Sequence, residues 1–97
     1  MFNNQRFVTC GIADELSPEL QAFLWKLIKE MEVTEQDYLQ VFDLSCCGNE
    51  QIIVHEQEQP EYKKEHRLEK ADTPIFVGKI FVIDDGDHTT MMKSDEY

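Results

Sequence analysis

The densest group of residues that could do chemistry is the stretch Asp84-Asp85-Gly86-Asp87-His88, near the end of the chain. Carboxylate oxygens are the preferred ligands of hard cations such as Ca²⁺ and Mg²⁺, so this stretch could hold a metal. An EF-hand loop, however, spreads its ligands over about 12 residues and ends on a bidentate glutamate, whereas the corresponding position here is Asp95. Asp-Gly is also a hairpin-turn signal that explains the same residues by backbone geometry. We therefore predict a type I′ turn, with no metal or other cofactor.

Two of the three cysteines, Cys46-Cys47, are adjacent and could supply a metal ligand or a reactive thiol. A zinc site needs about four ligands, commonly at two short paired spacings, and these cysteines with His55 and His66 do not form that pattern. A reactive thiol is favoured by a positive neighbour, whereas Asp43 and Glu50 flank the pair. The odd number of cysteines predicts reduced thiols and no structural disulfide.

His55 and His66 lie in a polar stretch, residues 55–70, with Pro60 between them. Proline cannot donate a sheet hydrogen bond, so Pro60 is expected at a chain reversal or on an edge strand. A hairpin around it would bring the two histidines face to face as a pair that titrates near neutral pH. The alternative is a solvated hairpin or loop in which neither flanking strand has a face to bury.

The composition predicts a single domain over residues 1–97, because a chain of 97 residues is too short for a second core. Nine Lys and Arg against twenty Asp and Glu give a net charge of −11, which disfavours nucleic acid or an anionic membrane as a direct partner. An acidic surface favours a basic protein partner, although it also keeps a protein in solution. No apolar run reaches the roughly 20 residues of a membrane span, and no signal-peptide pattern is present, so a cytoplasmic location is expected.

Glu56 and Glu58 belong to a run of acidic residues between Lys29 and Lys63 that contains no Lys or Arg. In a strand, these two glutamates would lie about 6.6 Å apart on one face. This spacing makes them candidate partner-binding residues, either for a basic protein surface or as part of a nucleic-acid mimic that blocks a DNA-binding protein.

A helix at residues 17–31 is the element expected to organise the fold, because only this segment repeats apolar residues at helical spacing over several turns. Ser17 is suited to cap the helix, and Pro18 to occupy its first position. Placing residues about 100° apart puts six apolar side chains on an arc of roughly 140°. These side chains are Leu20, Phe23, Leu24, Leu27, Ile28 and Met31.

Trp25 falls about 60° outside that apolar arc, on the Ile28 side. It could pack at the rim of the core, or it could stay exposed as an interaction anchor, because tryptophan is enriched at binding hot spots. We keep it as a candidate partner-binding residue.

Alternating apolar and β-branched residues predict the strands of a sheet. Residues 37–45 also show helical spacing and a capping-box pattern, so they could form a helix, but their aromatic and β-branched content favours a strand. A hairpin turn is expected at residues 46–50. The predicted strands are residues 6–12, 37–45, 51–54, 73–84 and 89–92, and residues 13–16 connect the first strand to the helix.

The strand within residues 73–84 is apolar on both faces, and one helix can cover only one of them. Burying a large apolar side chain is worth about 1.5 to 3 kcal/mol, so an uncovered second face would remove much of the net stability of a small domain. We therefore expect a curled, barrel-like sheet, or a cover formed by the polar hairpin, a ligand or a second copy. Of these we favour a homodimer through Val77, Phe81 and Ile83, because symmetric dimers commonly cover such a face.

Several segments spread over almost the whole chain carry a family resemblance. They are FVTCGI, LQAFLW, DYLQVFDL, QPEYKKE, VIDDGDHTTM and the final DEY. Together they resemble a family of short proteins from Gram-positive bacteria known as domain of unknown function 960. The resemblance implies a bacterial cytoplasmic protein, and it carries no activity, cofactor or catalytic residue over to this chain.

These observations predict an α+β fold in which a single amphipathic helix packs on a mostly antiparallel, curled sheet of five or six strands. An enzyme needs a pocket with placed acids, bases or metal, and no such set is evident in the sequence. The predicted function is a non-catalytic binding or interaction module with a protein partner. The alternatives are a small metal-dependent enzyme that uses the Asp84–His88 turn, and the nucleic-acid mimic.

Overall fold

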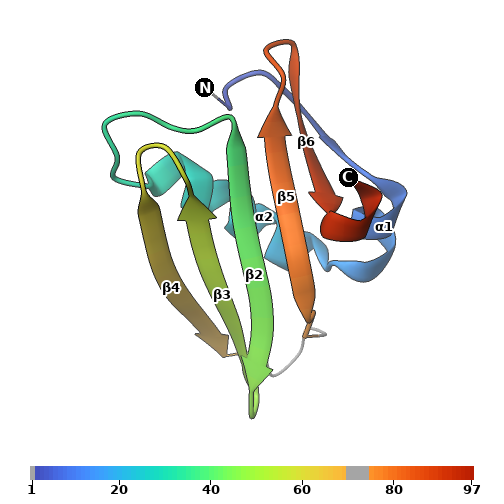
Figure 1. The fold of residues 1–97 in the computed structure, drawn as a ribbon. Coiled ribbons are helices and arrows are strands. Elements are labelled where there is room, and N and C mark those ends of the chain that lie inside the picture. The colour runs from blue at the N-terminus through green and yellow to red at the C-terminus, as the bar shows by residue number, and fades with distance from the viewer. Residues whose placement is uncertain (1, 70–74) are drawn as a thin grey trace.

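The computed structural model describes residues 2–69 and 75–97 of the chain. Its elements are β1 (Gln5–Val8), α1 (Cys10–Glu15), α2 (Pro18–Glu30), β2 (Leu39–Cys47), β3 (Glu50–Gln57), β4 (Tyr62–Glu69), β5 (Gly78–Asp84), β6 (His88–Lys93) and the 3₁₀ helix η1 (Ser94–Glu96). All six strands belong to one sheet in the order β1-β6-β5-β2-β3-β4 (Figure 1). The predicted α+β class and the strand number are confirmed.

The sheet is mixed, because β1 runs parallel to β6 while the other neighbouring pairs are antiparallel. It stays open, so the predicted curled, barrel-like closure is wrong. Closure would require pairing β1 with β4, and these edge strands make a poor pair: β1 has only four residues, and β4 is rich in charged side chains. In Figure 1, α2 lies behind the sheet, and the opposite face points toward the viewer.

Helix α2 begins where the sequence predicts. The Ser17 hydroxyl accepts a hydrogen bond from the Leu20 backbone N–H at 3.2 Å, and Pro18 occupies the first turn. Leu20, Leu24, Leu27 and Ile28 are buried, while Phe23 and Trp25 pack at the edge of the core.

The core lies between α2 and one face of the sheet. Strand β2 sends Phe42 and Leu44 into it, which confirms the strand prediction for residues 37–45 over the helical alternative. The other buried apolar residues of this face are Ile53, Ile80, Val82 and Met91.

The predicted strand at residues 6–12 is only half correct. The strand ends at Val8, and Thr9 caps a short helix by accepting a hydrogen bond from the Ile12 backbone N–H at 3.4 Å. Helix α1 also occupies the expected connection at residues 13–16, and it buries Ile12 completely. The alternation of Val8, Cys10 and Ile12 imitates a strand, but the capping threonine decides the local structure.

The hairpin turns lie at the positions that the sequence predicts, but the geometry of one of them differs from the prediction. Gly48, with φ +60°, lies in the turn between β2 and β3, and Pro60 lies in the turn between β3 and β4. Between β5 and β6, Gly86 has φ +102° but Asp85 does not have a positive φ, so the hairpin is confirmed and its predicted type I′ geometry is wrong. Residues 73 and 74 of the predicted strand 73–84 lie outside the described residues, and β5 itself begins at Gly78.

Candidate functional site

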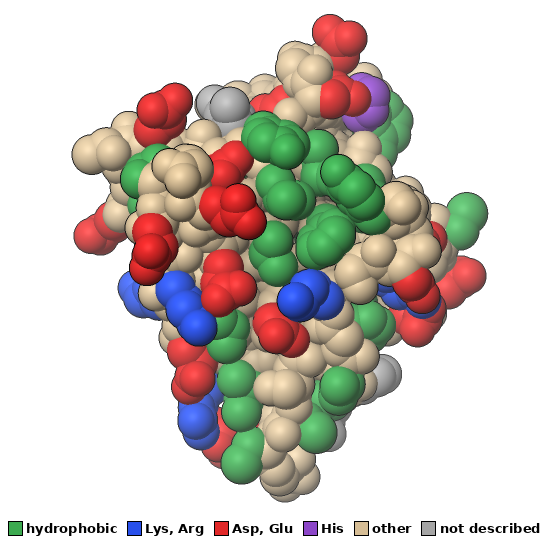
Figure 2. All heavy atoms as spheres, in the orientation of Figure 1, with side chains coloured by type: hydrophobic (Ala, Val, Ile, Leu, Met, Phe, Trp, Pro, Cys, Tyr) green, Lys and Arg blue, Asp and Glu red, His purple; other side chains and the backbone are tan. Residues whose placement is uncertain are grey.

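The face of the sheet opposite α2, called the open face below, changes from apolar to charged across its width. One row of paired residues runs from β6 to β4 in the order Met92, Phe81, Val41, Glu56 and Lys63. Figure 2 shows this face, with hydrophobic side chains gathered on one side and acidic side chains on the other. Helix α2 packs on the other face, while on the open face Tyr97 lies against Phe81 of β5 and η1 contacts the same strand.

The apolar half extends into the neighbouring row, where Leu39 pairs with Ile83. The Tyr97 ring meets the Phe81 ring edge-on, with 5.5 Å between the ring centroids. We call the set Leu39, Val41, Phe81, Ile83, Met92 and Tyr97 the apolar patch. Phe81, Leu39 and Val41 are only partly buried, so the molecule leaves this patch accessible.

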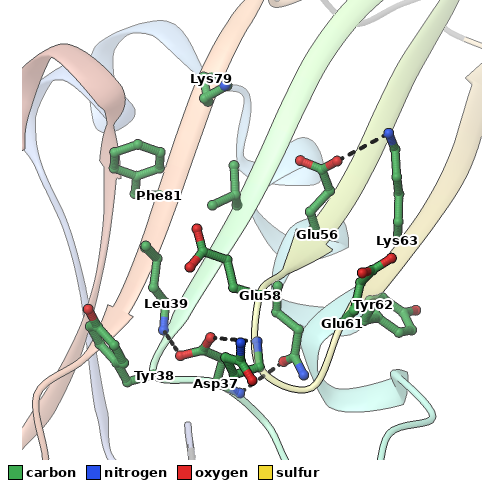
Figure 3. A pocket seen from close by; sticks show the side chains of 13 residues that line it. Asp37, Tyr38, Leu39, Glu56, Glu58, Glu61, Tyr62, Lys63, Lys79 and Phe81 are labelled. Carbon is green, nitrogen blue, oxygen red and sulfur yellow. Dashed lines mark hydrogen bonds and ion pairs between the residues drawn. The ribbon is translucent and has the colours of Figure 1, made fainter.

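A groove of about 760 Å³ lies where the apolar patch meets the charged half of the open face. Phe81, Leu39 and Val41 form its apolar side. Its carboxylates, called the acidic rim below, are Asp37, Glu56, Glu58 and Glu61 (Figure 3). The groove also contains Lys63 and Lys79, so carboxylates outnumber cations two to one.

The charges of the acidic rim are only partly neutralised. Lys63 pairs with Glu56 at 3.4 Å between Nζ and Oε1, and both side chains are well exposed. The Asp37 carboxylate accepts hydrogen bonds from the backbone N–H groups of Leu39 and Gln59 at 3.4 and 3.2 Å. Within the described residues, Glu58 and Glu61 have no ion-pair partner.

Gln57 holds the acidic rim in place from inside the protein. Its Oε1 accepts a hydrogen bond from the Asp37 backbone N–H at 2.9 Å, and its Nε2 donates to the carbonyls of Glu35 and Pro60 at 3.0 and 2.8 Å. One buried side chain therefore joins the α2–β2 connection to the β3–β4 turn. These two segments carry Asp37, Glu58 and Glu61.

His55 belongs to the same internal network. Gln40 donates through its Nε2 to Gln57 Oε1 at 2.7 Å and to the Asp37 carbonyl at 2.9 Å. The Gln40 Oε1 is thus left to accept from His55 Nε2 at 2.7 Å, which assigns the proton of the neutral imidazole to Nε2. His55 Nδ1 is then a buried acceptor without a partner.

The environment of His55 favours the neutral imidazole. Its ring is fully buried and stacks on the Phe42 ring with 4.4 Å between centroids. Burial, and to a smaller extent the nearby His66, lowers the pKa of His55 to about 4. The prediction that no strand beside Pro60 has a face to bury is wrong, because His55 and Gln57 satisfy most of their polar atoms within the protein.

The two histidines do not face each other across the hairpin as predicted. His55 pairs with Lys64, and His66 pairs with Ile53, so the histidines are offset along the helix-facing side of β3 and β4. Burial is the main cause that lowers the pKa of His66, and the charge of Lys64 adds to it.

The Asp84–His88 turn uses its carboxylates to hold the backbone. Asp84 accepts hydrogen bonds from the N–H groups of Phe2 and Gly86, each at 2.8 Å, and these bonds, the Phe2 bond foremost, lower the pKa of Asp84. Asp85 Oδ1 accepts from the N–H groups of Asp87 and His88, each at 3.1 Å. Within residues 2–69 and 75–97, no group of three His, Cys, Asp or Glu side chains is arranged to hold a metal.

All three cysteines are exposed and carry free thiols. Cys46 and Cys47 lie at the end of β2, away from the groove. In the described part of the chain, no helix combines the length and the apolar character needed to cross a membrane.

Comparison with known proteins identifies the family. A family model described as "Staphylococcal protein of unknown function (DUF960)" matches residues 5–96. The chain belongs to the DUF960 family. This confirms the resemblance found in the sequence and places the protein in a bacterial family.

A solved structure has the same fold as this DUF960 chain. It is described as "Crystal structure of the protein of unknown function from Enterococcus faecalis", and it matches with a TM-score of 0.85 and 22% sequence identity. The match covers 98% of this chain and 92% of that chain. No curated protein matches the chain.

The DUF960 fold brings four of the six predicted partner-binding residues to the open face. Phe81, Ile83 and Glu56 lie on its strands, and Glu58 lies in the turn after β3. Val77, which is 64% exposed, precedes β5 at the opposite end from Ile83. Strand β3 ends at Gln57, so Glu58 lies outside the strand. Glu56 and Glu58 therefore do not have the regular strand spacing that the nucleic-acid-mimic hypothesis requires.

Trp25 lies on α2, on the far side of the sheet from the groove. Its ring is partly buried, and the Arg6 guanidinium stacks over it with 4.8 Å between Cζ and the ring centroid. A separate hollow of about 450 Å³ around it is lined by Lys26, Lys29 and Glu30 as well. Trp25 therefore belongs to a different, more basic surface from Phe81.

Sequence reasoning placed Asp37 and Glu61 in the acidic run between Lys29 and Lys63 but did not single them out, and it did not find Gln57. Asp37 and Glu61 are distant in sequence and look like ordinary surface acids, and only the pairing of β3 with β2 and β4 brings them to one groove. Gln57 sits in a polar run with no periodic signal beyond its alternation with His55. That alternation is the one feature that could have indicated an inward-facing strand.

Proposed function

We propose that this DUF960 protein is a cytoplasmic, non-catalytic interaction module that binds another protein through the open face. The observation that supports this is the asymmetry of the sheet: α2 covers one face, while Leu39, Val41 and Phe81 stay accessible on the other. An exposed apolar patch bordered by charged residues is typical of a protein-interaction site. The sheet itself does not curl over this face, and the polar hairpin continues the sheet instead of covering it.

The positions of the titratable groups favour binding over catalysis. His55, whose pKa is lowered to about 4, is fully buried on the helix-facing side and has no access to the groove. The cysteines, which could act as nucleophiles, lie outside the groove residues. The exposed free thiols also favour a reducing, cytoplasmic location.

Site-specific cross-linking in the bacterial host tests this function. A photoreactive amino acid at position 81 should give discrete protein adducts, while the same group at position 22, exposed on α2, should give none. Light scattering of the purified protein then determines whether the partner is a second copy. Equal labelling from both positions, or no adduct from position 81, would contradict the proposed interaction face.

A further inference from the structure

The groove on the open face has an apolar side and an acidic side, and together they restrict the kind of ligand that fits it. Its apolar side consists of Leu39, Val41 and Phe81, and its acidic rim supplies four carboxylates against two lysines. Glu58 and Glu61 lack an ion-pair partner within the described residues. A ligand that fits must therefore offer apolar side chains along one line and positive charges beside them.

We infer that the groove receives a basic amphipathic helix of a partner protein, with its apolar stripe on the patch and Lys or Arg side chains on the acidic rim. This inference rests on the proposed function and specifies its partner. A sheet face is commonly covered by a helix in layered folds, as α2 covers the other face here. A helix of about 15 residues is about 22 Å long, which suits a molecule whose two larger dimensions are 36 and 27 Å.

The charges argue against a second copy as the occupant. In a two-fold symmetric dimer the same surface meets itself, so the acidic rim of one copy would face either the rim of the other or its opposite border. That opposite border is next to Tyr97 and, among the described residues, offers no free cation to the rim: Lys93 is paired with Glu15 and Asp95, and the Glu96 carboxylate is hydrogen-bonded to Thr9 and Gly11. Each copy also has a net charge of −11, so association would bring like charges together in either orientation.

The preformed shape of the rim supports a specific groove over a general acidic surface. Gln57 fixes the segments that carry Asp37, Glu58 and Glu61 through hydrogen bonds of 2.8 to 3.0 Å. The backbone that carries these carboxylates is thus held beside the apolar patch before any partner arrives. Preorganisation of this kind reduces the ordering that binding requires.

Three synthetic peptides test the inference on the full chain. The first has about 15 residues, with leucine at helical a, d and e positions and lysine elsewhere; the second replaces every lysine by glutamate; the third scrambles the first. Fluorescence anisotropy of the labelled peptides measures affinity, and NMR of the protein methyl groups maps the contact. We expect only the first peptide to bind tightly, with shifts at Leu39, Val41 and Ile83.

Variants of the protein separate the two chemistries. Glu58→Gln with Glu61→Gln should weaken binding of the leucine-lysine peptide roughly tenfold, and raising NaCl from 50 to 500 mM should reduce the effect of these substitutions because salt screens charges. Phe81→Ser should also weaken binding about tenfold, since it removes the central apolar contact. The matched control, Glu19→Gln with Glu30→Gln on α2, should leave affinity unchanged.

Each alternative result identifies what fails. Equal affinity for the scrambled peptide, or an equal loss in the α2 control, would show mere charge attraction and overturn the groove. Binding of the leucine-glutamate peptide at the open face would overturn the basic partner while leaving an interaction face. A wild-type dimer that Phe81→Ser dissociates would make a second copy the occupant. Absence of binding by all three peptides overturns the inference, and the cross-linking result then decides separately whether the proposed function survives.

Discussion

The two faces of the sheet differ in where they place polar and apolar side chains, and the difference is the reverse of a simple polar-outside pattern. The covered face buries Gln40, His55 and Gln57, while the open face leaves Leu39 and Phe81 accessible. The buried polar groups are stable because they hydrogen-bond to one another and to nearby backbone groups. The comparison teaches that a side chain's polarity alone does not determine its face; the availability of hydrogen-bond partners, or of a binding partner, also matters.

The largest expected contrast comes from truncating one phenylalanine on each face. Phe42→Ala should lower the free energy of unfolding by about 4 kcal/mol, because Phe42 is fully buried. Phe81→Ala should lower it by less than about 1.5 kcal/mol, because Phe81 is only partly buried. Urea unfolding followed by circular dichroism measures both. Equal losses would show that the open face is interior to the folded protein.

The internal network should make the covered face sensitive to acid. The folded-state pKa of His55 is about 4, below the usual histidine pKa of 6.5, so the unfolded chain binds the proton more readily. The contribution of neutral His55 is therefore complete above pH 6.5 and is lost as pH falls toward 4, by roughly 3 kcal/mol in total.

This effect can be isolated by comparing wild type with His55→Gln between pH 7.5 and 4.5. Acid also reduces the net negative charge of both proteins, and that shared contribution cancels in the difference. The stability of wild type should fall more steeply with acid than that of the variant. Parallel curves would mean that His55 does not titrate against folding.

Gln57 connects the two faces, because it is buried on one and positions the acidic rim of the other. Gln57→Leu leaves the Asp37 N–H and the carbonyls of Glu35 and Pro60 without their partner, which should destabilise the protein by about 2 kcal/mol. Gln59→Leu, at an exposed position in the same turn, serves as the control. A stability loss of the same size in both variants would argue against the internal network.

The smallest effect is expected at the Asp84–His88 turn. Ca²⁺, Mg²⁺, Mn²⁺ and Zn²⁺ should each change the melting temperature by less than about 1 °C, whereas specific binding at a hundredfold excess over Kd would add about 2.7 kcal/mol. A rise of several degrees that disappears in Asp85→Asn with Asp87→Asn would restore the metal-dependent alternative.

Local signals in the sequence were sufficient for part of the fold. Ser17, Pro18 and the apolar spacing of α2 identify the helix, and the alternation in β2 and β5 identifies strands and the two sides of each. The sequence did not reveal that β1 pairs in parallel with β6, because that pairing joins residues such as Gln5 and His88 from opposite ends of the chain. The sequence correctly predicts a second apolar face on the sheet, but the curled sheet expected to bury that face is wrong.

The apolar half of the candidate site was predictable from the sequence, and of the acidic rim only Glu56 and Glu58 were. Phe81 and Ile83 stand out because their strand is apolar on both sides, and no single-strand pattern could show that Asp37 and Glu61 join them. The polar stretch 55–70 predicts solvated side chains for His55 and Gln57, because the hydrogen-bond partners that allow their burial lie in other segments. Their burial depends on tertiary pairing, which a linear pattern does not contain.

The contacts between the two ends of the chain also restrict the order of folding. β1 pairs with β6, and Glu96 accepts hydrogen bonds from the Thr9 hydroxyl at 2.7 Å and the Gly11 N–H at 3.3 Å. During synthesis on the ribosome, β1 emerges early but has no strand to join until β6 follows. The β2–β3–β4 meander can form while translation continues, whereas the N-terminal strand and α1 must wait for the last residues, so the slowest step should be the docking of β1.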